Sequence, residues 1–188
     1  DDLTKNGNNT GVTFGEKLEL NTLDDVAALF QALFPILPSD TNGPYHLWKV
    51  DLHKAFKQVP LHPEYHNWAV FATRVPNPPR PEDVQHGLSP GDIVYWYPKA
   101  LPFGAAASPY LFTRVAHALV EIARRLFHIP LQYYLDDFWG IAPKGWAWAY
   151  YIAFKELLQA LGFKTKKEKC LDPAPSGSLL GIKVSFPD

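Results

Sequence analysis

The order of apolar patterns along this sequence predicts an α+β fold, in which helices pack on one face of an antiparallel sheet. When the segment between Pro60 and Lys99 is set aside as an insertion, the pattern runs strand, helix, strand, strand, helix, strand. This is the split βαβ order. The 188 residues are 47% hydrophobic and 20% charged, which is enough apolar material for the core of one domain. A single folded unit is therefore expected.

The first elements are a helix and a strand that follow a polar lead-in. Residues 1–15 are rich in Asn and Gly and predict irregular structure. Thr22 is of a type that caps helices, and the apolar spacing after it predicts a helix that ends before Pro35. A strand is expected at about Tyr45–Asp51, so that Asp51 stands at its carboxyl end.

The insertion is predicted to be a long surface loop or hairpin tip. An apolar, aromatic stretch at Trp68–Thr73 precedes the proline-rich segment Val75–Pro90, and a strand is expected at about Asp92–Tyr97.

Two helices and a closing strand are expected in the second half. Ser108 as the cap and Pro109 in the first turn predict a helix whose apolar spacing runs to about Phe127. A second amphipathic helix is expected at Trp146–Leu161, where a glycine stops it. The segment Ser178–Phe186 predicts a closing strand or hairpin.

Between these helices lies a predicted hairpin with carboxylates at its tip. Two short β-rich runs, 131–135 and 138–141, are separated by Asp136 and Asp137, a residue type that favours turns. In a split βαβ arrangement the first and third strands are antiparallel neighbours. Asp51 should therefore meet Asp136, although the two are far apart in the sequence.

Converging carboxylates repel one another unless something positive lies between them. An oxygen-only set without His or Cys suits Mg²⁺ better than zinc. Two such ions about 4 Å apart can activate an attacking hydroxyl and stabilise a leaving pyrophosphate. The alternative is a solvated hairpin turn, since adjacent aspartates are common, and the spacing alone favours it.

Five short motifs follow one another along the chain. They are Asp51-Leu52-His53-Lys54-Ala55-Phe56 followed by Val59-Pro60-Leu61, Leu101-Pro102-Phe103-Gly104 with Ser108-Pro109, Tyr134-Leu135-Asp136-Asp137, Leu161-Gly162-Phe163 leading to Lys169-Cys170, and Leu179-Leu180-Gly181. In this order they resemble the palm motifs of reverse transcriptases, which are RNA-directed DNA polymerases. Phe103, where retroviral enzymes carry Gln, indicates a retrotransposon branch, with a DIRS-like one as a candidate.

The resemblance implies a polymerase palm with a ferredoxin-like split βαβ sheet and partial fingers. Residues 45–59 and 101–188 would form the palm, and residues 1–44 and 60–100 the partial fingers, within one reverse transcriptase domain. The chain begins without Met, so we expect a piece of a longer protein whose thumb and other domains flank it. The piece alone is expected to have little activity.

The resemblance also implies a role for individual positions. The catalytic carboxylates would be Asp51, Asp136 and Asp137. The ligands of two Mg²⁺ ions, for which Mn²⁺ can substitute, would be Asp51, Leu52, Asp136 and Asp137. The nucleotide would lie near Lys54, Ala55, Phe56, Phe103 and Gly104, with Phe56 as the steric gate. Candidates for assisting the leaving group are Lys164, Lys166 and Lys169.

The implied partners are an RNA or DNA template with its primer and a deoxynucleoside triphosphate. A formal net charge of -1 is low for a nucleic-acid binder and counts mildly against this, although lysines cluster near the end of the chain. No apolar run approaches the roughly 18 residues that span a bilayer. No membrane partner is expected, and the location is expected to be intracellular, in cytoplasm or nucleus.

Two rival functions keep the polymerase fold. A domesticated, non-catalytic module would only bind RNA or protein, but such a scaffold does not need clustered acids beside a polyanion. An RNA-dependent RNA polymerase shares the carboxylates, whereas a bulky Phe56 is a feature that excludes ribose.

Two local patterns indicate other chemistry more weakly. Gly87-Leu88-Ser89-Pro90-Gly91 fits the G-x-S-x-G pattern of serine hydrolases, but a strand rather than a helix is expected after it. His62 and His66 have the spacing of zinc ligands on a helix, but Pro63 argues against a helix there. We interpret both histidines as surface residues.

Overall fold

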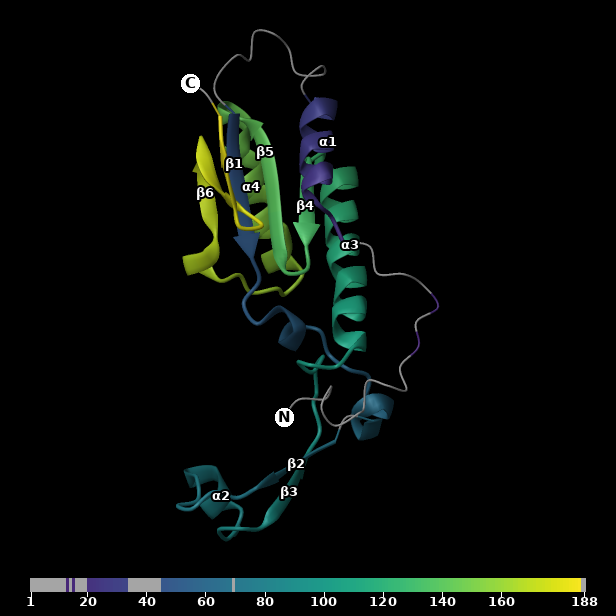
Figure 1. The fold of residues 1–188 in the computed structure, drawn as a ribbon, viewed down its shortest axis with the longest axis vertical. Helices are drawn as coiled ribbons and strands as arrows, with labels where there is room; N and C mark the ends of the chain where they lie inside the picture. Colours follow the sequence, from purple (N-terminus) through teal and green to yellow (C-terminus); the bar gives the residue numbers. More distant parts are fainter. Residues whose placement is uncertain (1–12, 14, 16–19, 34–44, 69, 187–188) are drawn as a thin grey trace. The chain divides into compact units, whose positions relative to one another are not determined.

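The computed structural model describes residues 13, 15, 20–33, 45–68 and 70–186 (Figure 1). The predicted irregular lead-in falls almost entirely outside them. The described chain divides into two compact units, one formed by Phe56–Ser108 and the other by Thr13–Ala55 with Pro109–Asp188. We call these the hairpin unit and the sheet unit and describe each by itself. No helix in the described ranges is long and apolar enough to cross a bilayer.

The sheet unit is built on four strands in the order β4-β5-β1-β6, and each strand is antiparallel to its neighbours (Figure 1). The strands are β1 (Tyr45–Asp51), β4 (Leu131–Tyr134), β5 (Asp137–Pro143) and β6 (Leu171–Ala174). Mixed helices and antiparallel sheet were predicted and are confirmed. The strand β1 also has the predicted bounds, because its buried positions are nearly continuous between two neighbouring strands.

One face of this sheet is covered by α3 (Ala107–Phe127) and α4 (Lys144–Ala160). Side chains alternate between the faces of a strand, so Trp48 and Phe138 point to the same side. The Trp48 ring lies 6.0 Å from that of Phe154 on α4. On α3, Arg124 donates hydrogen bonds of 2.7 and 3.1 Å to the carbonyl of Leu131 and thereby ties the helix to β4. These two helices lie on one face, as predicted.

The other face holds a second apolar cluster made of Leu47, Trp139, Ile141 and Leu179. Leu179 belongs to a hairpin of β7 (Ser176–Leu179) and β8 (Ile182–Ser185). Leu29 of α1 (Leu23–Leu33) also packs against this cluster. The helix α1 thus packs on the face opposite α3 and α4, whereas the predicted one-face packing concerned the helices of the palm. The contacts group α1 with the sheet, and the assignment of residues 1–44 to partial fingers stays a prediction.

The fourth strand of the sheet differs from the expected one. The sequence pattern indicated Ser178–Phe186, but that segment forms most of the separate β7–β8 hairpin. The edge of the sheet is β6, which pairs with β1 at Leu47–Ala174 and Lys49–Leu171 with an irregular step between them. Pro173 in the middle of β6 hides its strand character, and an edge strand tolerates proline because only one side is paired.

The end of α4 lies where the local sequence predicts it. Gly162 follows α4 with a positive φ of 85°, and the N–H of Phe163 donates to the Leu158 carbonyl at 2.8 Å. This pairing is a Schellman motif, which stops the helix as predicted.

The start of α3 differs from the prediction, because the helix begins at Ala107 and the Ser108 hydroxyl donates to the Pro102 carbonyl at 2.6 Å. It anchors the preceding loop and does not cap the helix.

The hairpin unit contains β2 (Phe71–Arg74) paired antiparallel with β3 (Ile93–Trp96), so the hairpin interpretation of the insertion is confirmed. Its proline-rich connection also contains a short helix, α2 (Pro81–Gln85), which was not predicted. Arg80 sets the start of this helix, since its backbone N–H and guanidinium both donate to the Asp83 carboxylate.

Candidate active site

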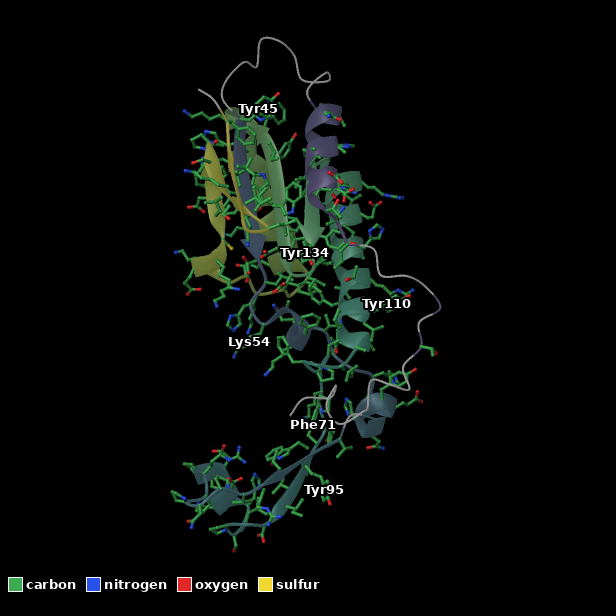
Figure 2. All side chains as sticks on the ribbon, viewed as in Figure 1. Tyr45, Lys54, Phe71, Tyr95, Tyr110 and Tyr134 are labelled. Carbon is green, nitrogen blue, oxygen red and sulfur yellow. The ribbon has the colours of Figure 1, made fainter. Side chains whose placement is uncertain are left out.

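Asp51 meets the acidic hairpin at one edge of the sheet, although the acid that stands opposite it is Asp137 and not the predicted Asp136. Asp51 is the last residue of β1, and the antiparallel register places it directly opposite Asp137, the first residue of β5. The two-residue turn Leu135–Asp136 joins β4 to β5, with Leu135 in the left-handed region at a φ of 52°. Figure 2 shows Tyr45 and Tyr134 at opposite ends of the sheet, and the acids belong to the Tyr134 end.

Backbone hydrogen bonds hold this edge together beyond the last strand pair. The Leu52 N–H donates to the carbonyl of Asp136 at 3.3 Å, and the His53 N–H donates to that of Lys164 at 2.9 Å. The Lys166 N–H in turn donates to the Asp51 carbonyl at 2.8 Å. Three of the five motifs, separate in the sequence, are thus joined around Asp51.

The ammonium groups of two lysines offset part of the negative charge of these acids. Lys49 Nζ lies 2.7 Å from Asp137 Oδ2, and Lys169 Nζ lies 3.4 Å from Asp51 Oδ2. Lys169 was among the three candidate lysines, and this geometry places its ammonium at a predicted catalytic carboxylate. Lys49 was missed by the sequence analysis. The available signal was the period of two along a strand, which puts Lys49 on the same face as Asp51.

The environment of Asp51 disfavours its charged form. Asp51 is 3% exposed, and this burial is the main reason why its pKa is raised above the ordinary value. The nearby Asp137 carboxylate raises the pKa further, because it accepts a hydrogen bond only from protonated Asp51. The charge of Lys169 lowers it in opposition. A cation bound in place of the proton would stabilise the ionised carboxylate at this site.

The acids at this edge meet some of the requirements of a site for a divalent metal ion. Within the described residues, no group of three or more His, Cys, Asp or Glu side chains is arranged to hold a metal. The predicted set of Asp51, Leu52, Asp136 and Asp137 is therefore not assembled as a closed site. Asp51 and Asp137 nevertheless supply hard oxygen donors, and Asp137 Oδ1 is buried without a hydrogen-bond partner in the described part of the chain. A buried carboxylate oxygen of this kind suits Mg²⁺.

The predicted nucleotide-binding residues are divided between the units. Lys54 is exposed with a φ of 50°, and Ala55 is buried at the end of the sheet unit. In the hairpin unit, the rings of Phe56 and Phe103 meet edge-on with centroids 5.3 Å apart. Gly104 follows at a φ of 81°. The role of these residues at a nucleotide stays a prediction.

The two weaker sequence patterns do not form sites of their own. His66 stacks on Tyr97 with ring centroids 5.0 Å apart, and His62 Nδ1 lies 3.6 Å from Glu64. Contacts with these neighbouring side chains account for the positions of both histidines. Ser89 is exposed and leads through a turn into β3, whereas a hydrolase nucleophile would stand before a helix.

Comparison with known proteins agrees with this geometry. A search among curated proteins found no significant match. The family model described as "Reverse transcriptase (RNA-dependent DNA polymerase)" matches residues 17–184, which include all three acids and nearly all of both units. Because this match spans most of the sequence, the chain belongs to the reverse transcriptase family.

Proposed function

We propose that this chain is the catalytic core of an RNA-directed DNA polymerase that adds deoxynucleotides to a primer 3′ end. In this proposal the sheet unit is the palm, because its strand order β4-β5-β1-β6 is that of a split βαβ sheet. The hairpin unit would form part of the fingers. The parent would be a retroelement, DIRS-like or otherwise, acting inside the cell.

The observation that carries the proposal is the register of β1 and β5. It places Asp51 against Asp137 and ties the Asp136 backbone to Leu52. Acids brought together from the ends of two strands cost stability when they are ionised. A solvated hairpin turn needs no buried acid from a second strand, so the arrangement favours a cation-binding role.

In the proposed reaction, the primer 3′-hydroxyl oxygen attacks the α-phosphorus of the nucleotide and pyrophosphate leaves. Two Mg²⁺ ions, when bound, would activate the hydroxyl and neutralise the phosphates. Asp51 and Asp136 would be the principal ligands with the backbone of Leu52, and Asp137 would assist. Lys169 is within reach of Asp51 and could release it to pair with the leaving group. Lys164 and Lys166 contribute backbone contacts to the same edge.

Nucleotide and template binding belong to the same proposal. Lys54 and the backbone near Ala55 would meet the triphosphate, since amide groups and a lysine favour anionic oxygens. Phe56, supported by Phe103 and near Gly104, would exclude the 2′-hydroxyl. An RNA or DNA template with its primer would be held with the help of a thumb and other flanking domains.

The alternative is a domesticated, non-catalytic module that binds only RNA or protein. Primer extension separates the two functions. The chain, extended with its natural flanking sequence, should elongate a DNA primer on an RNA template with deoxynucleotides and Mg²⁺. The variants Asp51→Asn and Asp136→Asn should lose at least about a thousandfold in rate, because each removes a charge that balances the metals. Glu156→Gln, at an exposed position on α4, is the matched control.

If the extended wild type and both Asn variants extend primers equally, or none of them does so while RNA binding persists, the catalytic proposal is wrong. In the second case the binding module would be the better interpretation. Activity with ribonucleotides as the preferred substrate would instead indicate an RNA polymerase.

A further inference from the structure

We propose that Lys49 is a positioning residue that holds one oxygen of Asp137, leaves the other for the metal, and keeps metal affinity low before a nucleotide binds. The inference rests on the proposed function, because it concerns the same acids. Nothing in the five motifs indicated such a role for Lys49.

The contact is specific and partly buried. Lys49 Nζ donates to Asp137 Oδ2 at 2.7 Å, and the two side chains are only 19% and 26% exposed. In the strand register Lys49 stands opposite Trp139 of β5 and opposite Leu171 of β6. Neighbours on both sides therefore confine the lysine stem, and its ammonium reaches diagonally to the Asp137 carboxylate.

This contact makes the two oxygens of Asp137 inequivalent. Oδ2 accepts the charged hydrogen bond, whereas Oδ1 is buried and, when Asp51 is ionised, has no partner among the described residues. A buried carboxylate oxygen without a partner is unfavourable, so it is the atom that gains from a cation. We infer that Asp137 binds metal through Oδ1 alone while Lys49 keeps Oδ2.

Lys49 differs from Lys169 in how firmly it is held. The Lys169 ammonium lies 3.4 Å from Asp51 Oδ2 on a side chain that is 56% exposed. Lys169 can therefore move away when phosphates arrive, whereas the shorter and more buried Lys49 contact is retained. Its fixed positive charge beside the acids opposes the entry of a divalent cation until nucleotide phosphates add negative charge.

Two effects of removing Lys49 have opposite signs. Loss of the ammonium removes repulsion of a doubly charged ion at short range, which tightens metal binding. Loss of the contact also frees the Asp137 side chain, which weakens binding. Asp137 sits in a paired strand with few rotamers, so the electrostatic effect should dominate. A purely structural role for Lys49 would give the opposite result.

The test measures Mn²⁺ affinity of the 188-residue chain by electron paramagnetic resonance without nucleotide. Lys49→Met should bind Mn²⁺ about tenfold more tightly than wild type, because a nearby opposing charge is gone. In EDTA the same variant should melt at a lower temperature, since the acids lose their counter-ion. Lys183→Met, an exposed lysine on β8, should change neither property.

Lys49→Gln keeps a hydrogen-bond donor for Oδ2 without the charge, and it covers the case in which Lys49→Met does not fold. It should also bind Mn²⁺ more tightly, whereas Lys49→Arg should resemble wild type. Affinity that is unchanged or weaker in both neutral variants overturns the inference about Lys49. If instead wild type and Asp51→Asn bind Mn²⁺ equally, the proposed function itself fails, so the two failures are distinguishable.

Discussion

Asp51 and Asp137 face each other across the β1–β5 pair, one at the end of its strand and the other at the start. The pairing brings two acidic groups to one place, and Asp51 is buried there, with β5 on one side and the backbone of Lys166 on the other. Lys49 and Lys169 offset part of the cost. Stability and the proposed function therefore conflict at this edge.

Asp51→Asn should make the metal-free protein more stable at neutral pH. A raised pKa in the folded state means that folding favours protonated Asp51, so its ionisation lowers stability as pH rises through the raised pKa. The neutral amide removes that cost. In EDTA at pH 7, each kcal/mol gained should raise the melting temperature by roughly 2–4 °C. The variant also loses the 3.4 Å ion pair with Lys169, but solvent screens the largely exposed ammonium of that lysine, so this loss should be the smaller effect.

At pH 3 the advantage of the variant should disappear, because wild-type Asp51 is then protonated as well. Glu156→Gln, at an exposed position on α4, is the control for replacing an acid by its amide. A variant that is less stable than wild type at pH 7, by the same amount as at pH 3, would contradict the role of burial.

Gly140→Ala should destabilise the sheet unit. A Cβ at Gly140 would lie 2.5 Å from Trp48 Cζ2 and 3.0 Å from the Pro130 carbonyl oxygen. Trp48 is fully buried against Tyr151 and Phe154, so it cannot move away freely. Overpacking of this kind costs about 1–3 kcal/mol. Urea denaturation measures the loss.

Gly145→Ala is the matched control, because a Cβ at Gly145 in α4 meets no described atom within 4 Å. Alanine is the better helix former, so this variant should be neutral or slightly more stable. Equal unfolding free energies for the two alanine variants would show that the Trp48 contact is not tight.

Phe56→Val should relax the choice of sugar in an extended, active chain. If the Phe56 ring lies beneath the sugar, it leaves room for a 2′-hydrogen and collides with a 2′-hydroxyl. The smaller side chain should raise ribonucleotide incorporation by about tenfold or more, and tenfold corresponds to about 1.4 kcal/mol. Single-nucleotide extension with each nucleotide type measures the ratio.

Phe103→Leu tests whether the edge-on contact with Phe56 supports the gate. It should relax discrimination by a smaller factor, because Phe56 itself remains. If Phe56→Val selects deoxynucleotides as strongly as wild type, or loses both activities in parallel, Phe56 is not the gate.

The sequence predicted the structure correctly where a local pattern and a topological rule indicated the same arrangement. Thr22 precedes α1 as expected, and its hydroxyl donates to Asp25 at 3.0 Å. The split βαβ order placed Asp51 beside the acidic hairpin, and the register confirms that neighbour relation. The same order predicted that Asp51 meets Asp136, whereas Asp137 stands opposite Asp51, because the two-residue turn leaves Asp136 at its tip.

Other features depended on tertiary contacts that no local pattern shows. The strand β6 contains Pro173 and takes its place in the sheet by pairing with β1. The helix α2 depends on the pairing of Arg80 with Asp83 within a proline-rich segment. The contact of Lys49 with Asp137 joins residues on different strands, so it can be predicted only once the strand register is known.

The central claim is that the acids at this edge bind metal together with a nucleotide. The most direct test titrates Mn²⁺ into the 188-residue chain with a deoxynucleoside triphosphate and follows bound Mn²⁺ by electron paramagnetic resonance. We predict binding that is tighter with the nucleotide than without it, because phosphates complete the coordination shell, and loss of binding in Asp51→Asn and Asp136→Asn but not in Glu156→Gln. Identical titrations for wild type and both Asn variants would contradict the claim.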